Sequence, residues 1–488
     1  MKPIHPSWQF YALVLGLFCG LVVSIAFRLP LCGEFYWLFL AIAFFIVTLC
    51  FSRRLFLIFA FLSGFILGNF RAFPYLASQN LFSSLSGQTV TLSGTVSDDP
   101  DFSAGNYVIH LQNLCLISES AQNCSVGTAY VKLAREADLA RSDTVTLRGK
   151  LSDGFGTFVT SLFRPEITSI TKPNPGHLFA QFKAFFAERV RTYLGSPAAD
   201  LGLGYLMGEK SGLTEDFSEA LRLVGITHVI VASGSHLGIL VSVAKRLFGR
   251  ISKFAGLLSS LLLTAVFVLI VGFTPSMTRA ALVTSLSLLA GYVGRQFTPW
   301  RLLSLVASLT LFIEPINFLS LGWQLSFASF FGILILAPRL SRFLYGGKTP
   351  PWLASMLITS FATGLVCAPI LIYNFGSLSL LSLVANLLIL PTLPYAMLLV
   401  FLTGAASFCP PIARAVAYPT TVLLQLHIFF VNFLSEKTMF VINLPADNPI
   451  FFLLYLPILV FVAWPHLRRA LPPLTKNKSL WYSNNYES

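Results

Sequence analysis

Charge is scarce in this chain of 488 residues: Asp, Glu, Lys and Arg make up 11%, whereas hydrophobic residues make up 55%. The mean hydropathy is +0.74. Many apolar runs approach or exceed the ~20 residues that an α-helix needs to cross a bilayer. A cleavable signal peptide is also missing, because the run at 9–27 is too long and lacks a small-residue cleavage site after it. These absences exclude a soluble globular protein and predict an integral membrane protein.

Acidic residues are scarcer than basic ones: the chain has 20 Asp and Glu against 33 Lys and Arg, which gives a net charge of +13. Such an excess invites a nucleic-acid partner, so its location matters. Between residues 75 and 178, nine acidic residues outnumber seven basic ones, for a net charge of −2. Most of the basic excess lies in short loops between apolar runs, where the positive-inside rule places it. The total charge is therefore weak evidence for a DNA partner.

Three apolar runs open the chain, at 9–27, 35–51 and 55–70. Arg53 and Arg54 in the tight second link indicate a cytoplasmic loop, and Lys2 places the N-terminus on the same side. After three crossings, the chain emerges on the outer face at about residue 72. We predict N-terminal membrane helices over 1–72.

The next stretch is polar and alternates with period two, with Gly, Asp, Asn and Ser between the alternating segments. Five β-strands are predicted, at 89–96, 107–117, 128–134, 144–151 and 158–163. Five strands in some 80 residues are typical of a small closed barrel of the OB type, and a small β-sandwich is the alternative. We expect an inserted all-β OB-like domain over 75–175 on the outer face.

Two cysteines of this domain, Cys115 and Cys124, lie nine residues apart around a loop. The outer side of the membrane is oxidising, so a disulfide between them is predicted. The alternative is two unrelated, half-buried thiols.

A turn-rich KPNPG segment at 172–176 separates the β-domain from two amphipathic stretches, and together the stretches form a surface region at 176–224. The first, 177–194, has the pattern of a helix lying on the outer membrane surface. In the second, 200–224, Thr214 is the predicted N-cap of a helix, with Glu215 and Asp216 in its first turn.

Apolar runs then return over 225–466, which we interpret as a transmembrane bundle. They lie at 229–247, 254–272, 277–294, 302–313, 318–337, 353–373, 377–408, 411–434 and 449–464. Basic residues in alternate loops place both termini in the cytoplasm, including a basic tail at 467–488. The predicted fold class is a polytopic α-helical membrane protein with about ten to twelve transmembrane helices.

The stretch GITHVIVASGSHLGIL at 225–240 opens an apolar segment yet contains His228, Ser233, Gly234 and His236. Polar residues at membrane depth are costly and mark functional sites. A Ser–His nucleophile is conceivable, but no nearby acid orients the histidine. Two histidines on one helix face are also potential metal ligands, and Glu209 is a possible third. The remaining interpretation is a polar, kinked wall of a passage, because Ser-Gly-Ser favours a bend.

Three further isolated polar residues lie in the apolar runs. Arg279 follows Pro275, which suits a helix start, and it either faces an outer cavity or snorkels to the interface. Gln324 is typical of a residue that hydrogen-bonds between helices. Asn386 precedes Pro391 in what resembles a discontinuous helix lining a cavity.

These motifs together resemble those of the ComEC-type competence proteins, the inner-membrane DNA channels of natural transformation. The family's G-[DE]-[KR]-S-G-L turn is present as GEKSGL, with Glu209 and Lys210. Its Ser-Gly-x-His run is present at 233–236, where Ser235 departs from the usual leucine. TPSMTRAAL, WQLSFAS and VANLLILP, which contain Arg279, Gln324 and Asn386, are similar as well.

The resemblance implies a channel that carries incoming single-stranded DNA across the inner membrane, with no cofactor and no enzymatic activity. It also implies an outer DNA receptor and a cytoplasmic DNA translocase or helicase as partners, and the channel is a possible homo-oligomer. Many family members continue into a metallo-β-lactamase-like domain; the tail here has no His/Asp metal cluster, so another protein would degrade the second strand. The alternatives are a membrane-embedded metal- or Ser/His-dependent hydrolase and a transporter of a small anionic solute.

DNA contacts are expected from basic residues outside the membrane. The candidates near the bundle are Lys183, Arg189, Arg191, Arg222, Lys210 and Arg279. In the β-domain, Arg141, Arg148 and Lys150 are candidate phosphate contacts, and Tyr107, Phe155 or Phe158 are candidate stacking platforms.

Overall fold

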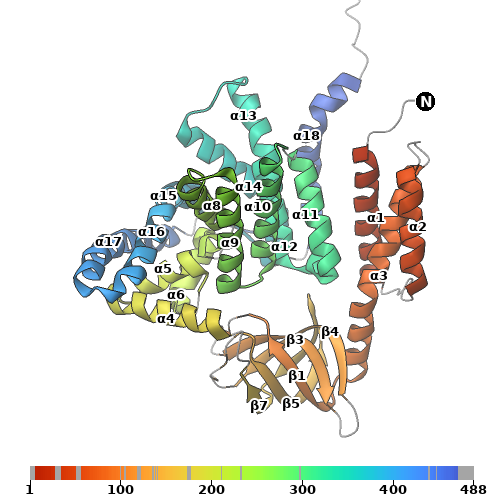
Figure 1. Cartoon of the computed structure of the whole chain (residues 1–488), viewed down its shortest axis with the longest axis horizontal. Helices are drawn as coiled ribbons and strands as arrows, with labels where there is room; N and C mark the ends of the chain where they lie inside the picture. The colour runs from red at the N-terminus through yellow and green to blue at the C-terminus, as the bar shows by residue number, and fades with distance from the viewer. Residues whose placement is uncertain are drawn as a thin grey trace, which may run out of the picture. The chain divides into compact units, whose positions relative to one another are not determined.

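The computed structural model is mostly helical, with one β-domain (Figure 1). It describes residues 6–27, 35–50, 56–98, 100–103, 106–117, 122–134, 137, 139, 141–172, 177–209, 212–230, 234–295, 298–437, 440–446 and 448–470. The chain divides into two compact units. The first comprises Met1–Phe327 and Ser379–Val441, and the second comprises Ala328–Leu378 and Ile442–Ser488.

The chain begins with α1 (Pro6–Phe27), α2 (Phe35–Cys50) and α3 (Phe56–Ser84), close to the three predicted runs. Glycines bring the backbones of α1 and α3 into contact. A Cβ added at Gly16 would lie 2.0 Å from the carbonyl oxygen of Phe61, and one at Gly64 would lie 2.0 Å from that of Leu13. Such close approach is how membrane helices pack without a hydrophobic driving force.

The third helix continues well past the predicted end of its run at residue 70. Its last turns carry Tyr75, Leu76 and Phe82, which are buried in the core of the β-domain. The helix therefore connects the membrane hairpin to the β-domain without a flexible linker, which the polar composition after residue 72 does not reveal.

All five predicted strands are present, four of them with ends within two residues of the prediction; β4 begins six residues earlier than predicted, and two further strands were missed. The strands are β1 (Thr89–Val96), β2 (Asp101–Ser103), β3 (Asn106–Ile117), β4 (Gln122–Leu133), β5 (Thr144–Asp153), β6 (Phe158–Phe163) and β7 (Glu166–Thr171). β2 has only three residues, and every residue of β7 is exposed, so neither has the alternating burial that marks a strand.

Strand pairing closes the β-domain into a ring. β1 pairs with β3, β3 with β4, β4 with β6, β6 with β5, and β5 again with β1. The β4–β6 pair is parallel and the other four are antiparallel. Leu92, Leu111, Val131, Leu147 and Leu162 fill the interior. The domain is thus barrel-like, and the ring of pairings contradicts the sandwich alternative.

Three helices follow the β-domain: α4 (His177–Leu194), α5 (Ala198–Met207) and α6 (Glu215–Val224). The predicted bounds of α4 are confirmed, and Thr214 caps α6 by accepting a hydrogen bond from the amide of Phe217. However, all ten residues of α5 are buried. The prediction of one amphipathic stretch over 200–224 is therefore wrong for its first half, which forms the core of the first unit.

The first unit continues with the short α7 (Thr227–Ile230) and then with longer helices. They are α8 (Gly234–Phe248), α9 (Lys253–Val271), α10 (Pro275–Tyr292), α11 (Pro299–Ile313), η1 (Pro315–Leu319), α12 (Leu321–Phe331), α15 (Leu381–Ile389), α16 (Leu393–Ala405), η3 (Ala406–Phe408) and α17 (Pro410–Ser435). The second unit contains η2 (Gly332–Leu336), α13 (Ala337–Tyr345), α14 (Trp352–Phe375), η5 (Pro449–Leu454) and α18 (Tyr455–Ala470); β8 (Ser377–Ser379) and β9 (Val441–Asn443) pair at its border.

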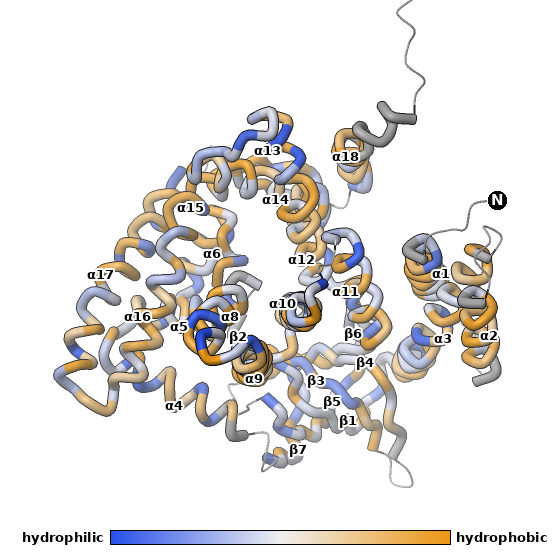
Figure 2. The backbone as a smooth tube through the Cα atoms, turned by 45° about the horizontal axis from the view of Figure 1, so that its top comes forward, coloured by the Kyte–Doolittle hydropathy of each residue, from blue (hydrophilic) through white to orange (hydrophobic). Residues whose placement is uncertain are grey.

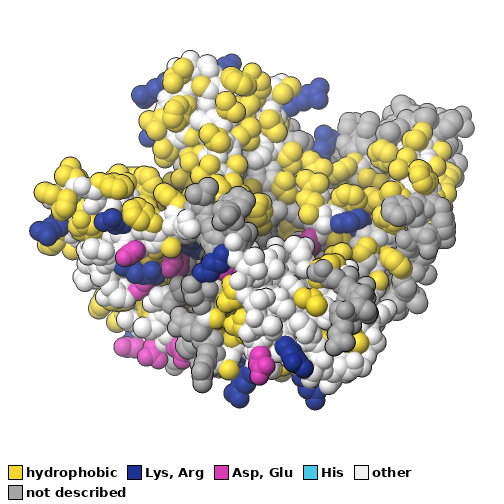
Figure 3. All heavy atoms as spheres, turned by 60° about the horizontal axis from the view of Figure 1, so that its bottom comes forward, with side chains coloured by type: hydrophobic (Ala, Val, Ile, Leu, Met, Phe, Trp, Pro, Cys, Tyr) yellow, Lys and Arg dark blue, Asp and Glu magenta, His cyan; other side chains and the backbone are white. Residues whose placement is uncertain are grey.

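Within the described residues, six helices are long and apolar enough to cross a membrane, or seven if the bent pair α15–α16 forms one span. Three further apolar helices are shorter. This is fewer than the ten to twelve predicted, in part because the run at 229–247 includes residues outside the described ones and α11 has only 15 residues. Apolar residues dominate the helices along their length (Figure 2), and hydrophobic side chains cover much of the helical surface (Figure 3).

Candidate functional site

The GEKSGL turn between α5 and α6 is held by a cluster of charged side chains. Arg191 of α4 makes an ion pair of 2.6 Å with Glu209, from Nη2 to Oε1, and one of 3.0 Å with Asp200, from Nε to Oδ1. Asp200 also accepts a hydrogen bond from Ser196. A Cβ at Gly212 would lie 2.1 Å from Asp200 Oδ1, so the turn packs directly on this carboxylate. The motif therefore needs its glycine here to let the carboxylate approach.

Two carboxylates surround the Arg191 guanidinium. Burial lowers the pKa of Arg191, but the hydrogen bonds and charges of Glu209 and Asp200 outweigh burial and raise it. Arg191 is thus engaged as a structural cation and is poorly placed as the phosphate contact that the sequence predicts. Lys210 lies outside the described residues.

The stretch 225–240 begins at a helix end. α6 ends at Val224, and its C-cap Gly225 has a left-handed φ of +79°; α7 and α8 follow on either side of residues 231–233, which lie outside the described residues. His228 is exposed, whereas His236 is fully buried. The two histidines thus differ in burial, and the kink predicted at Ser-Gly-Ser stays a prediction because residues 231–233 lie outside the described part of the chain. Ser233 lies outside the described residues.

Arg279 lies in the second turn of α10, which starts as predicted with Pro275 in its first turn and Thr274 as N-cap. Only 6% of Arg279 is exposed, and its guanidinium carbon lies 6.0 Å from the ring centroid of Phe327. A snorkelling arginine would reach the surface. The burial of Arg279 favours the alternative, in which this cation faces the interior of the bundle.

Gln324 of α12 bonds to the short helix that precedes it. Its Nε2 donates to the backbone oxygen of Phe318 in η1 at 3.0 Å. The neighbouring Ser326 is buried, with its Oγ 3.5 Å from that of Ser276 in the first turn of α10. This motif thus packs beside the start of α10.

The predicted discontinuous helix around Asn386 is confirmed. α15 and α16 are bent by 51° at a short break. The buried Oδ1 of Asn386 has no hydrogen-bond partner among the described residues. Gly225 packs closely on the same segment, since a Cβ there would lie 3.1 Å from that of Ser382. The two broken regions of the motif set therefore meet.

A buried histidine that the sequence analysis missed lies at this second break. His427 of α17 hydrogen-bonds through Nε2 to Oγ1 of Thr392, at 2.7 Å, in the break itself. Its ring also lies 5.7 Å from that of Tyr205, whose hydroxyl is buried without a partner among the described residues. The sequence did contain a feature that could have indicated this residue, because His427 is a lone histidine in an otherwise apolar run.

The other basic candidates near the bundle differ in accessibility. Lys183 is buried on the inner face of α4. Arg189 is exposed, with its guanidinium carbon 5.0 Å from the centroid of Phe185. Arg222 binds Glu219 through two nitrogens, at 2.6 and 2.7 Å. Of these three, only Arg189 is both exposed and without a carboxylate partner among the described residues.

The predicted basic residues of the β-domain do not form one site. Arg141 donates to the backbone oxygens of Leu269 and Ile270 at the end of α9, so it joins the β-domain to the bundle. Arg148 and Lys150 are exposed on β5. Their strand is separated from β3 by β1 and from β4 by β6 in the ring. They therefore lie on the opposite wall of the barrel from β3 and β4.

An aromatic cluster covers the outer wall of β3, β4 and β6. We call it the aromatic face; it consists of His110, Tyr130, Phe155, Phe158 and Phe163. The ring centroid of Tyr130 lies 5.2 Å from Phe155 and 5.5 Å from Phe158, and His110 lies 4.9 Å from Phe158. Phe155 is 49% exposed and Phe163 is 52% exposed. Apolar rings left in water at this density indicate a binding surface.

The aromatic face was only partly predicted. Phe155 and Phe158 belong to it, but Tyr107 is partly buried against the barrel core instead. His110 and Tyr130 were missed, although they lie directly opposite each other in the β3–β4 register. Both residues occupy outward-facing positions of alternating strands, which the sequence pattern indicates. That they lie next to each other could be predicted only with the strand register known.

One carboxylate borders the aromatic face. Asp98, in the loop after β1, pairs with His110 at 3.2 Å from Oδ2 to Nδ1. The hydrogen bond with His110 lowers the pKa of Asp98, and this effect outweighs the opposing effect of burial. The face therefore carries a negative charge at its edge.

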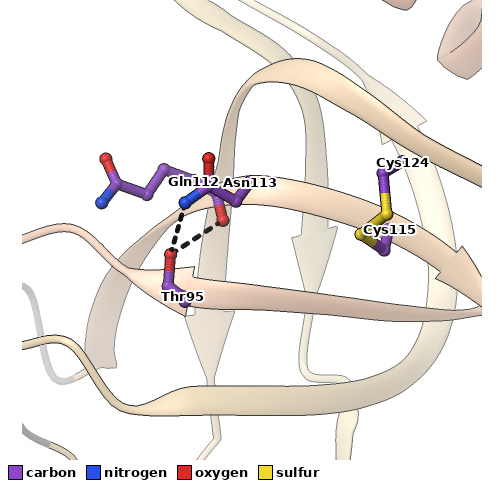
Figure 4. The surroundings of a disulfide bond; sticks show 5 residues. All are labelled: Thr95, Gln112, Asn113, Cys115 and Cys124. Carbon is purple, nitrogen blue, oxygen red and sulfur yellow. Dashed lines mark hydrogen bonds between the residues drawn. A yellow bond between two sulfur atoms is a disulfide. The ribbon is translucent and has the colours of Figure 1, made fainter. Parts of the chain in front are cut away.

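The predicted disulfide is confirmed. Cys115 of β3 and Cys124 of β4 are bonded and lie opposite each other in the register (Figure 4). The bond closes the outer end of the β3–β4 hairpin, whose inner part carries the first two rings of the aromatic face.

The chain joins a small β-barrel to apolar helices of membrane-spanning length, including one pair bent at a short break. By length and composition, it is a multi-pass membrane protein. The model of the family described as competence protein matches residues 205–469. The chain belongs to this competence protein family.

Two relatives have matching sequences. ComE operon protein 3 of Bacillus subtilis is 27% identical over 199 residues, which is 39% of this chain and 24% of the relative. Recombination protein 2 of Haemophilus influenzae is 27% identical over 217 residues, which is 41% of this chain and 27% of the relative. The matched part thus spans about a quarter of each curated relative. No solved structure matches the chain significantly.

Proposed function

We propose that this protein acts in DNA uptake during natural transformation, as a non-enzymatic passage for single-stranded DNA across the inner membrane. One observation carries the proposal: the family match at 205–469 contains the helix end at Gly225 and the bent α15–α16 pair, with polar residues near both. Broken membrane helices expose backbone groups, which is tolerated only in protein interiors or along a water-filled cavity. A passage satisfies this requirement better than an anchor does.

The polar side chains of this region suit an anionic polymer. Arg279 supplies a buried cation near the start of α10, and Asn386 supplies a buried amide oxygen near the α15–α16 break. Arg191 fixes Glu209 and Asp200, so its role is to hold the turn before the first break in shape. Arg189 remains as the exposed cation of α4 for steering phosphates.

The β-domain is proposed to receive the strand before the passage. A ring of five strands with an aromatic outer wall supports an OB-like domain, a fold that binds oligonucleotides on its strand face and adjoining loops. Stacking on aromatic rings tolerates any base and contributes about 1–3 kcal/mol per base. We infer that the aromatic face stacks bases, and that Arg148 and Lys150 lie beside it on β5, the strand that pairs with β6.

The proposal places the N-terminus in the cytoplasm and the β-domain outside, as the basic loops indicate. It needs an outer DNA receptor and a cytoplasmic translocase or helicase, because a passage supplies no driving force. Among the described residues, no three His, Cys, Asp or Glu side chains gather around a potential metal site. The described structure thus offers no observation that favours the hydrolase, and none that distinguishes a transporter of small anions.

The proposal is tested by following fluorescent DNA into a strain that lacks this protein. We expect DNA to reach the outer compartment, become resistant to external nuclease there, and fail to enter the cytoplasm. Complementation with the wild-type chain should restore entry. Normal cytoplasmic entry without the protein would refute the function.

The aromatic face is tested separately with the purified full chain in detergent and a fluorescent oligo-dT probe. Tyr130→Ala together with Phe158→Ala should weaken binding about tenfold or more, since two stacking rings are lost. Phe429→Ala is the matched control, because Phe429 is an exposed ring on α17, outside the β-domain. Equal affinity of the double variant and the control would remove the β-domain from the proposal while leaving the passage intact.

A further inference from the structure

A cavity of about 770 Å³ opens where α8 ends, α9 begins and α10 ends. Four basic side chains line it: Lys245, Arg246, Arg250 and Lys253. Four glycines also border it and leave backbone accessible, whereas the described lining contains no Asp or Glu. The volume is within the range of small-ligand sites in proteins, about 300–1,000 Å³.

No described Asp or Glu side chain pairs with these four basic residues. All four are exposed, and none makes an ion pair with a carboxylate among the described residues. The sequence has no Asp or Glu at all between Glu219 and Glu314. Four like charges around one cavity repel each other, and an anion placed among them would relieve that repulsion.

The backbone adds to this positive potential. α9 begins at Lys253 with Ser252 as N-cap, so the amides of its first turn and the positive end of its dipole lie at the cavity. Together, the cations and the helix end form a site suited to a phosphate group.

Apolar surface leads from the cavity along α9. Leu257 forms part of the cavity floor and is buried. On the outer side of α9, Phe254, Leu258 and Leu262 recur every four residues and are 57%, 53% and 63% exposed. This spacing places them in one stripe. A ligand with a phosphate head and a hydrocarbon tail matches both parts, whereas a nucleic acid would leave the stripe unused.

The cavity lies at the membrane face opposite the β-domain. Arg141 of the β-domain contacts Leu269 and Ile270 near the far end of α9. α9 has 19 residues and is therefore about 28 Å long, close to the thickness of the hydrocarbon core. The cavity is thus at headgroup depth in the opposite leaflet, which is the cytoplasmic one if the β-domain is outside.

We propose that this basic cavity binds the phosphate headgroup of an anionic phospholipid, with an acyl chain along the Phe254–Leu258–Leu262 stripe. Basic pockets between membrane helices on the cytoplasmic side are suited to such headgroups. The site is independent of the DNA passage, and its failure would leave the proposed function unaffected.

The test uses the full-length protein in detergent micelles and native mass spectrometry with added phosphatidylglycerol or phosphatidylcholine. Wild-type protein should retain phosphatidylglycerol in preference. Arg246→Gln with Arg250→Gln should lower its affinity about tenfold, since each removed cation weakens the attraction to an anionic headgroup. The matched control is Arg301→Gln with Arg342→Gln, which removes two exposed cations elsewhere and should bind like wild type.

A second variant tests whether any loss of binding comes from misfolding instead of lost charge. Arg246→Lys with Arg250→Lys keeps both charges and should keep the preference for phosphatidylglycerol. Equal retention of the two lipids by wild-type protein would overturn the proposal, as would unchanged phosphatidylglycerol binding by the glutamine variant. Loss of oligo-dT binding by that variant, with phosphatidylglycerol binding intact, would overturn it in favour of a nucleic-acid phosphate.

Discussion

Two asparagines in apolar helices, each with a buried Oδ1, distinguish the N-terminal hairpin from the family-matched region. Asn69 of α3 accepts a hydrogen bond from Ser24 of α1 and donates to the carbonyl of Phe65 at 2.9 Å. The Oδ1 of Asn386 in α15 is also buried, but it has no partner among the described residues. The first asparagine serves helix packing, whereas the second has a hydrogen-bonding capacity that packing does not use.

The helices around these residues differ in the same way. α1 and α3 pack backbone to backbone over Gly16 and Gly64, without a break. The matched region is interrupted at Gly225, between α6 and α7, and again between α15 and α16. Continuous helices whose polar side chains are hydrogen-bonded suit a membrane anchor. Broken helices with buried polar atoms that lack a hydrogen bond suit a passage. Each of the following substitutions tests this difference.

The largest effect is expected for Gly64→Leu in the hairpin. A Cβ at Gly64 would lie 2.0 Å from a backbone oxygen of α1, and a backbone atom cannot move aside as a side chain can. We expect a loss of about 3 kcal/mol of stability, at the upper end of typical overpacking. Thermal unfolding in detergent measures it. Gly364→Leu in α14 is the control, since no neighbouring atom of the described residues lies within 4 Å of a Cβ added there.

Arg191→Ala should have the next largest effect. It leaves the buried Asp200 and the largely buried Glu209 without their cation. Breaking a fully buried pair costs about 3–5 kcal/mol, and we expect about 2 kcal/mol because the side chain of Arg191 is 40% exposed. Arg222→Ala, which breaks an exposed pair, should cost much less in the same unfolding assay. Equal losses would mean that the turn cluster is not structural.

The asparagine pair gives a smaller and more specific test. Asn69→Leu should cost about 1–2 kcal/mol, because it leaves Ser24 without its partner. Asn386→Leu should change stability by less than about 0.5 kcal/mol, or increase it, because the lost group is unsatisfied. Cytoplasmic DNA entry should nevertheless fall for Asn386→Leu. A loss of stability as large as that of Asn69→Leu would make Asn386 a packing residue.

The sequence allowed more of the fold to be predicted than of the site. Alternation gave five strands and amphipathicity gave α4, because both patterns follow from which face is buried. β7 was not predicted, because all its residues are exposed and no alternation of buried and exposed residues indicates a strand. The buried α5 was mistaken for a surface helix, because its neighbour α6 supplied the polar residues of the stretch.

The site was harder because it depends on contacts between distant segments. The break near Asn386 was visible in its prolines. The engagement of Arg191 by Asp200 and Glu209 was not, since it joins α4, α5 and the following turn. The aromatic face likewise required the register that sets His110 opposite Tyr130. Residue type and spacing indicate chemistry, but they do not reveal which charges are already neutralised.

The smallest expected effect concerns Asp98 at the edge of the aromatic face. Its pKa is lowered by the hydrogen bond with His110. A carboxyl with a lowered folded pKa stabilises the protein fully above its unfolded pKa of about 3.9 and loses that contribution as pH falls through the folded value. The stability difference between wild type and Asp98→Asn should therefore be present at pH 6 and shrink below about pH 4. Thermal unfolding at low salt, repeated in a His110→Gln background where the pH dependence should vanish, measures this. A difference that persists without His110 would assign the shift to another neighbour.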